Sequence, residues 1–251
     1  MKKEASRQSD SLIFEGMTSI SAVINGKNRK LEKVIADEEK LYSKKKQIDY
    51  LTHRASEMGF EMVFTSNEEI EKLTTGNSHG GIIAICSERE IPPLEELSPK
   101  ADGFYVMIDG IEDPYNFGYA LRTIYAAGAD AVVLTPRNWM SAAGVVCRSS
   151  AGASELLPIY VSESDAACSF FKNHGIKVIC AGIRNSVSAF DADLKKPLFL
   201  VVGGEKRGIS AKVLSLADTV VRLDYGREFN GSLSAASAAS VLSYEILRQN
   251  R

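Results

Sequence analysis

Five short apolar runs recur after residue 103, and none of them alternates with polar positions. Strands that are covered by helices on both faces are continuously apolar in this way. Helical patterns cover residues 119–127, 166–173 and 232–249. The alternation of runs and helices predicts a parallel α/β sheet over residues 103–251. The runs are Phe104–Ile108, Ala131–Leu134, Ile176–Cys180, Leu198–Val202 and Thr219–Leu223.

The first ninety residues predict a separate, smaller α/β domain over residues 11–90. Residues 1–10 are polar and are expected to form a disordered leader. Residues 91–102 carry prolines and charges, which predicts a linker between the two domains. Within the smaller domain, the pattern predicts strands at Leu31–Ala36, Glu61–Phe64 and Ile82–Cys86 and a helix over Glu39–Met58.

Composition narrows the class of protein. Hydrophobic residues make up 45% of the 251 positions, enough for a sizeable core. The chain holds no run of eighteen apolar residues and no apolar signal segment near its start, so we expect no membrane span and a cytoplasmic location. The cysteines and histidines are too scattered for metal-ligand spacing, so we expect no metal site. They are Cys86, Cys147, Cys168, Cys180, His53, His79 and His174.

The net charge of −2 means that nucleic-acid binding would need a local basic patch. Two runs are candidates: residues 27–33, with Lys27, Arg29, Lys30 and Lys33, and residues 44–46, which are three lysines. Ordinary solvated positions on a loop and a helix explain both runs equally well.

A glycine-rich turn follows the fourth apolar run, with the sequence Gly203-Gly-Glu-Lys-Arg-Gly208. Glycines there permit positive φ and close approach of the backbone to a ligand. The spacing matches neither a P-loop nor the dinucleotide fingerprint. Further on, Ser232–Ser240 consists almost entirely of very small residues, which allow another segment to pack closely. The sequence therefore predicts a pocket built largely from main chain, although a plain turn with Glu205 at the surface is the alternative.

A third motif, Asp109–Thr123, follows the first strand of the larger domain. Asn116 is expected near the start of a helix that begins around Phe117, and Arg122 lies about one and a half turns into it. Asn116 could simply cap the helix and Arg122 could pair with a surface acid. Alternatively, both face a substrate near the strand ends, where α/β sheets bind ligands.

Taken in order, the three motifs resemble those of the SpoU/TrmH-type branch of the SPOUT RNA methyltransferases. Asp113-Pro-Tyr-Asn-Phe-Gly-Tyr-Ala-Leu-Arg-Thr123 is similar to the family's Asp-Pro-x-Asn-x-Gly-x-x-x-Arg-Thr. Gly203–Ile209 is similar to its Gly-x-Glu-x-x-Gly-Leu, and Ser149–Pro158 to its Ser-Ala-Gly-Ala segment. Gly76–Ala84 and Phe14–Val34 resemble parts of its N-terminal RNA-binding domain, so the likeness covers nearly the whole chain.

The resemblance implies a fold, a cofactor and a reaction. Family members are homodimers with a deep trefoil knot that binds S-adenosylmethionine, and they methylate a ribose 2′-hydroxyl, here expected in ribosomal rather than transfer RNA. By position, the cofactor contacts would be Gly182, Gly203, Gly208, Ile209, Leu223 and Leu233. The catalytic positions would be Arg122, Asn116, Glu205, Ser232 and Ser234.

The segment Ser232–Ala236, at the start of the run of very small residues, departs from the family pattern Ser-Leu-Asn-Val-Ser. Ser234 stands where the family has asparagine, and Ala236 stands where it has the second serine. Asn230 or Arg227 could take over a polar contact. A catalytically impaired, RNA-binding family member is therefore the alternative hypothesis, and a small-molecule enzyme on the same α/β plan is a weaker one.

Overall fold

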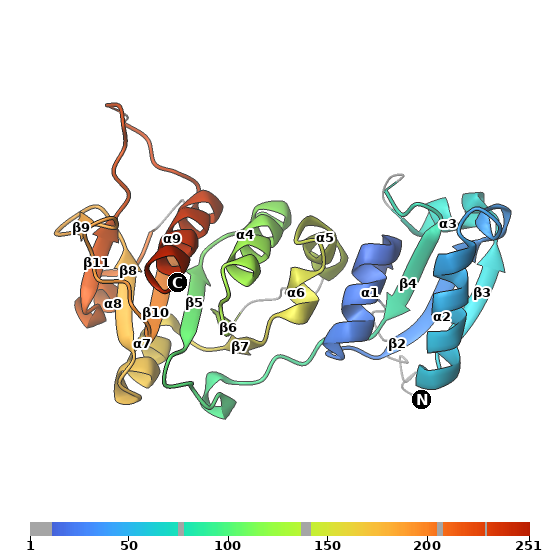
Figure 1. The fold of residues 1–251 in the computed structure, drawn as a ribbon, viewed down its shortest axis with the longest axis horizontal. Coiled ribbons are helices and arrows are strands. Elements are labelled where there is room, and N and C mark those ends of the chain that lie inside the picture. The colour runs from blue at the N-terminus through green and yellow to red at the C-terminus, as the bar shows by residue number, and fades with distance from the viewer. Residues whose placement is uncertain (1–11, 75–77, 137–141, 205–207, 229) are drawn as a thin grey trace, which may run out of the picture. The chain divides into compact units, whose positions relative to one another are not determined.

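The computed structural model describes residues 12–74, 78–136, 142–204, 208–228 and 230–251 (Figure 1). The chain divides into two compact units. The first contains residues up to Glu90 together with the segment from Trp139 to Leu156, and the second contains Ile91–Asn138 and Leu157–Arg251. No helix in the described part of the chain combines the length and the apolar character that crossing a bilayer requires.

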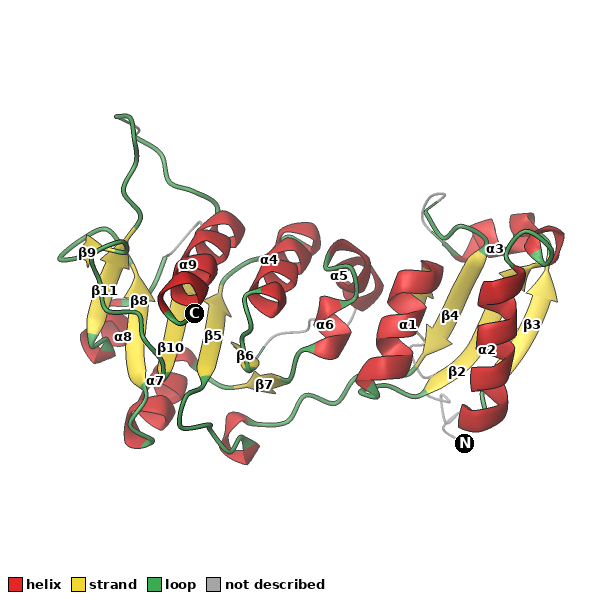
Figure 2. Ribbon diagram, viewed as in Figure 1, coloured by secondary structure: helices red, strands yellow, loops and turns green. Residues whose placement is uncertain are grey.

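The first unit is built on a four-stranded mixed sheet with the order β1-β4-β2-β3 (Figure 2). Strands β2 and β3 are parallel, and β4 runs antiparallel to both β1 and β2. Phe14, Ile24 and Leu51 are fully buried in its core. The elements are β1 (Leu12–Glu15), α1 (Gly16–Gly26), β2 (Leu31–Asp37), a 3₁₀ turn (Glu38–Lys40), α2 (Lys45–Met58), β3 (Glu61–Thr65), α3 (Asn67–Leu73) and β4 (Ile82–Cys86).

Two short helices from later in the chain, α5 (Ala143–Ser149) and α6 (Ala153–Leu156), also belong to the first unit. Ala143 and Cys147 join its apolar core. The Arg29 guanidinium donates to the Glu155 carboxylate at 2.9 Å, and both side chains are almost fully buried. The expected assignment of all of residues 103–251 to one domain is therefore wrong for this segment, because its apolar and charged partners lie in the N-terminal unit.

The second unit is a seven-stranded parallel sheet with the order β7-β6-β5-β10-β8-β11-β9, which confirms the predicted α/β class. A cluster of buried side chains from β5, β8 and β10 packs against α7 and α8. Helices α4 and α9 pack against each other, and α9 also contacts β10 (Figure 1). The strands are β5 (Phe104–Asp109), β6 (Ala131–Leu134), β7 (Ile159–Val161), β8 (Lys177–Ala181), β9 (Val187–Ser188), β10 (Leu198–Gly203) and β11 (Thr219–Arg222). The helices are α4 (Pro114–Ala126), α7 (Ser164–Asn173), α8 (Ala211–Leu216) and α9 (Ala235–Gln249).

The segment expected to be a linker, residues 91–102, instead packs onto the second unit. Leu94, in a 3₁₀ turn over Leu94–Glu96, is fully buried in the cluster that contains Phe171. The Val161 N–H donates to the Pro92 carbonyl at 3.0 Å and ties the segment to the edge strand β7. Prolines mark this segment as irregular chain, but a buried leucine anchors it.

Candidate functional site

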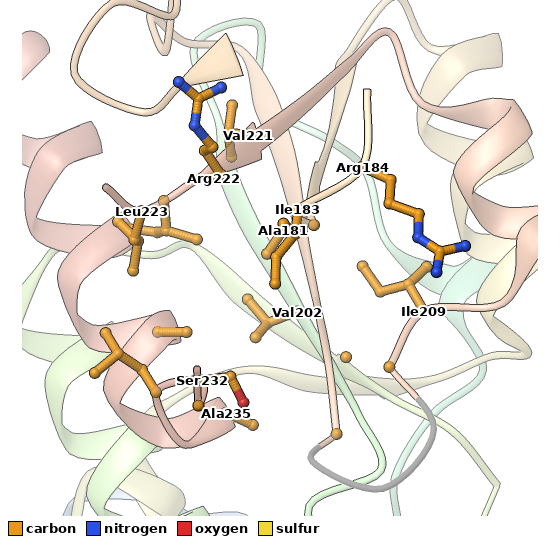
Figure 3. Close-up of a pocket in the computed structure, with 18 of the residues that line it drawn as sticks. Ala181, Ile183, Arg184, Val202, Ile209, Val221, Arg222, Leu223, Ser232 and Ala235 are labelled. Carbon is orange, nitrogen blue, oxygen red and sulfur yellow. The ribbon is translucent and has the colours of Figure 1, made fainter. Parts of the chain in front are cut away.

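A cavity of about 680 Å³ lies where β8, β10 and β11 end in the second unit (Figure 3). Because the three strands are parallel, their carboxyl ends meet at one edge of the sheet. The walls come from the chain after β8 (Ala181–Arg184), the end of β10 with Gly208 and Ile209, the end of β11 (Val221–Tyr225), and the start of α9 with the loop before it. The cavity volume is typical of small-molecule sites.

Two glycines at the end of β10 allow the chain to fold tightly against itself. A Cβ atom on Gly203 would lie 2.5 Å from the carbonyl carbon of Gly208 and 2.6 Å from the nitrogen of Ile209. A Cβ on Gly204 would meet the backbone of Gly110, where φ is +93°. The Gly208 N–H donates to the Gly204 carbonyl at 2.9 Å, so the turn closes on itself. The predicted wall of main chain is therefore present at this turn.

All six residues predicted to contact the cofactor line this one cavity: Gly182, Gly203, Gly208, Ile209, Leu223 and Leu233. They come from four separate segments of the chain. One predicted contact differs in detail, because the Leu233 N–H donates to the Tyr225 hydroxyl at 3.2 Å. That bond ties the loop before α9 to the chain after β11.

Several lining residues were not anticipated. Figure 3 shows Ala181, Ile183 and Val202 between Ile209 on one side and Leu223 on the other. These residues belong to no motif and differ little from ordinary core positions. The signal that could have found them is topological, since the ends of neighbouring parallel strands always share one edge.

Charged side chains line the cavity at two places: Arg184 after β8, and Arg222 with Asp224 at the end of β11. Arg222 donates to Asp224 at 2.8 Å and to the Ser186 carbonyl at 2.7 Å. The Ser188 hydroxyl, together with Arg222, holds the pKa of Asp224 below its ordinary value. The cavity therefore combines apolar walls and backbone with an ionised carboxylate near one end.

The predicted catalytic residues are not all in one place. Ser232 lines the cavity (Figure 3). Ser234 does not, and it caps α9 instead. Asn116 and Arg122 lie on α4 outside the cavity lining, and Arg122 is exposed. Glu205 lies outside the described residues.

The start of α4 also differs from expectation. The helix begins at Pro114 rather than near Phe117, and its N-cap is Asp113, whose carboxylate accepts from the Asn116 N–H at 2.8 Å. Asn116 therefore does not cap the helix. Proline in the first turn needs no N–H partner, which explains the early start.

The chain belongs to the SpoU rRNA methylase family, whose model matches residues 103–244. Residues 13–92 match a second model, described as RNA 2′-O ribose methyltransferase substrate binding. The protein is accordingly an RNA methyltransferase of the SpoU family. These two matches cover the second unit's strands and most of the first unit.

Named relatives and a solved structure agree with this family. A Bacillus subtilis protein named as a TrmH family tRNA/rRNA methyltransferase, YacO, is 28% identical over 89% of this chain and 94% of its own. The 23S rRNA (guanosine-2′-O-)-methyltransferase RlmB of Shewanella oneidensis is 27% identical over 80% of this chain and 83% of its own. The fold matches that of the SpoU methyltransferase AviRb from Streptomyces viridochromogenes, solved with AdoMet, at a TM-score of 0.81 and 20% identity, over 96% and 92% of the two chains.

Proposed function

We propose that this protein transfers a methyl group from S-adenosylmethionine to a ribose 2′-hydroxyl of ribosomal RNA. The observation that carries the proposal is the convergence of six motif-derived residues on one cavity at the carboxyl edge of the sheet. The match of residues 13–92 to a 2′-O ribose methyltransferase substrate-binding model supports the ribose as the target. The names of the relatives support ribosomal RNA, with transfer RNA as the alternative substrate.

The cavity suits S-adenosylmethionine in size and chemistry. Ile183, Val202 and Leu223 offer apolar surface for an adenine ring, and backbone groups at Gly182 and Gly203 stand beside it. Adenine needs an apolar slot and a few backbone hydrogen bonds rather than a charged partner. When bound, the cofactor supplies an electrophilic methyl group on a sulfonium. The AdoMet complex of AviRb, which has the same fold, is consistent with this assignment.

The chain's own residues would position the RNA and handle its proton. A 2′-hydroxyl is a weak nucleophile, so it must be held in line with the methyl group and lose a proton. Arg122 is exposed and accessible to RNA. Its guanidinium stays protonated at neutral pH, so we assign it to holding a phosphate or hydroxyl oxygen rather than to taking the proton. Asn116 and Ser232 are assigned to orienting the ribose, and Glu205 to holding the active-site turn.

We also propose that two copies associate through α4 and α9. Tyr115 and Tyr119 are one helical turn apart and form an exposed aromatic stripe on α4. Val241 and Tyr244 form a similar exposed stripe on α9, which packs beside α4. Exposed aromatic side chains grouped in this way are typical of protein interfaces. The deep knot and the cytoplasmic location remain predictions from the family resemblance and the sequence.

The direct test is methyl transfer with the full-length protein and labelled S-adenosylmethionine. Ribosomal RNA and transfer RNA, both from cells that lack this gene, are the two substrate arms, and nuclease digestion followed by mass spectrometry identifies the product. We expect a 2′-O-methyl nucleoside in the ribosomal arm. Label on a base, or label only in transfer RNA, would overturn the ribose or the ribosomal assignment respectively. Cofactor binding by calorimetry with no transfer in either arm would favour the impaired family member.

A further inference from the structure

A cavity of about 360 Å³ lies within the first unit, at the N-terminus of α1. Its walls are Glu15 with the first turn of α1, Lys44 just before α2, the turn Ser78–Gly80, and Arg148 of α5 with Ala151. Among the described residues that line it there is no phenylalanine, tyrosine or tryptophan, and the one imidazole, that of His79, is almost fully buried, so the cavity offers no accessible ring on which a base could stack. Its side-chain donors are Lys44, Arg148, His79 and hydroxyl groups, and it also contains the Glu15 carboxylate.

His79 is the most informative of these donors. Its side chain is nearly inaccessible, with an exposed fraction of 3%. The Gly81 N–H donates to His79 Nδ1 at 3.0 Å, so in the neutral ring the proton must be on Nε2. Within the described chain, Nε2 has no hydrogen-bond partner. Because a buried donor without an acceptor is costly, Nε2 at this cavity indicates a ligand oxygen.

Two cations stand beside His79. Arg148 Nη1 donates to Glu15 Oε2 at 2.6 Å and also contacts the Ser78 hydroxyl, which donates to the same carboxylate oxygen at 2.9 Å. Glu15 therefore neutralises Arg148 and fixes its position. The Lys44 ammonium reaches the turn, since a Cβ on Gly80 would lie 3.2 Å from Nζ. It has no acidic partner among the residues that the structure describes, so the cavity carries an excess of one positive charge.

The end of α1 adds backbone donors. No side chain caps the first turn of this eleven-residue helix. The unpaired N–H groups of a first turn and the helix dipole both favour an anion at that end. The helix N-terminus, Lys44 and His79 thus line one small cavity from three separate parts of the chain.

We propose that this cavity binds a phosphate group of the RNA backbone. A phosphate offers several acceptor oxygens and negative charge, which matches a set of donors with no stacking surface. The inference rests on the proposed function for the identity of the RNA. The site fixes RNA on the substrate-binding unit without reading its sequence, because backbone phosphates carry no sequence information.

The first experiment follows the three imidazoles of the full-length protein labelled with [¹⁵N]histidine. Inorganic phosphate and a short single-stranded RNA of mixed sequence are added in separate titrations at constant pH and ionic strength. We expect both to shift the His79 ring resonances, while His53 and His174, which are exposed, stay in place as internal controls. A His79 signal that moves with neither probe overturns the proposal.

The second experiment measures binding of ribosomal RNA to Lys44→Ala and His79→Asn as the salt concentration is varied. The asparagine keeps a polar group near the Gly81 N–H and removes the Nε2 donor. Lys44→Ala should weaken binding about tenfold and lower the slope of log affinity against log salt by about 1. Lys72→Ala, which removes the same charge from an exposed position on α3 outside the cavity and outside both basic runs, is the matched control.

The outcomes separate this site from the enzymatic activity. If phosphate shifts His79 but both variants bind RNA like the wild type, the cavity holds a free anion and the RNA proposal is wrong. If the wild type transfers methyl groups while the variants keep normal affinity and salt slope, this site fails and the proposed function stands. If the wild type transfers no methyl group but the variants lose RNA affinity, the function fails and the site stands.

Discussion

The Ser234 hydroxyl accepts a hydrogen bond from the Ser237 N–H at 3.1 Å and so caps helix α9. The same position is asparagine in the family pattern that the chain resembles. Asparagine and serine are both strongly preferred N-caps, so this departure keeps the structural contact seen here. Ser234→Ala should lower the stability by about 1 kcal/mol, visible as a melting temperature reduced by about 2–4 °C, and Ser234→Asn should restore it.

That pair of variants also addresses the catalytic assignment of Ser234. If capping is its role, Ser234→Ala at a temperature well below melting should retain most of the methyl transfer. A loss of transfer without a loss of stability would instead indicate a contact with the RNA. Thermal denaturation and the transfer assay, run on the same preparations, distinguish the two results.

Gly203→Ala should strongly weaken cofactor binding. The added methyl group would lie within 2.6 Å of the Gly208 and Ile209 backbone, which cannot move away as the end of a flexible side chain could. Overpacking of this kind typically costs about 1–3 kcal/mol, and here it distorts the cavity wall directly. Calorimetric titration with S-adenosylmethionine measures the effect. Gly226→Ala is the matched control, since a Cβ there meets nothing within 4 Å, and equal losses in both variants would contradict the close-packing argument.

Arg122→Ala should reduce methyl transfer by about 10²–10³-fold, the usual loss for one positioning group aimed at the transition state. Affinity for S-adenosylmethionine should not change, because Arg122 does not line the cavity. Single-turnover transfer and calorimetry separate these quantities. Lys195→Ala removes an exposed charge from the same unit and should leave both unchanged. If Arg122→Ala also bound S-adenosylmethionine more weakly, the assignment of Arg122 to holding the RNA would be wrong.

Tyr244→Glu should shift the protein from dimer to monomer. Tyr244 is 50% exposed on α9, and a carboxylate there would have to be desolvated in a paired surface. Sedimentation velocity over a range of protein concentrations gives the result. Tyr42→Glu is the control, because it places the same charge at a residue of the first unit that is 92% exposed. A wild type that sediments as a monomer at every concentration would refute the proposed α4 and α9 interface.

Acid should remove one specific contribution to stability. Arg248, with Gln249, holds the pKa of Glu245 below its ordinary value of 4.5 through hydrogen bonds of 2.7–2.8 Å. Since the folded pKa is the lower one, the contribution is complete above the unfolded pKa and disappears as the pH falls through the folded pKa. The wild type should therefore melt above Glu245→Gln at neutral pH, and the gap should close on acidification. A gap independent of pH would contradict this.

Sequence pattern predicted five of the seven strands of the larger sheet because each of the five is a continuous apolar run, but it did not predict the short edge strands β7 and β9. It predicted the start of α4 poorly, since Pro114 was interpreted as part of a loop although proline is favoured in a first helical turn. The pattern did not predict the short elements β1, α3 and α8, because they are too short to show a repeating hydrophobic period. The assignment of α5 and α6 could not have been predicted locally, because it depends on contacts between residues more than a hundred positions apart, such as Arg29 and Glu155.

The candidate site was predictable where a motif carried it. The residues that we predicted to contact the cofactor come from strand ends and glycine turns, and they line one cavity. The order of the motifs along the sequence placed Asn116 and Arg122 in the same site. Both residues lie on α4, however, and neither lines the cavity. The role of Asn116 and Arg122 depends on the position of the bound RNA, and no local sequence pattern specifies that position.

The helices α5 and α6 also limit how the chain can be divided. A single cut near residue 90 would leave these helices covalently attached to the second unit but deprived of the core that Phe14 and Ile24 provide. Such a C-terminal fragment would expose Ala143 and Cys147 and leave Glu155 without Arg29. The two units, although each is compact, are therefore interleaved along the chain, and we expect neither to be recovered intact by limited proteolysis at one site.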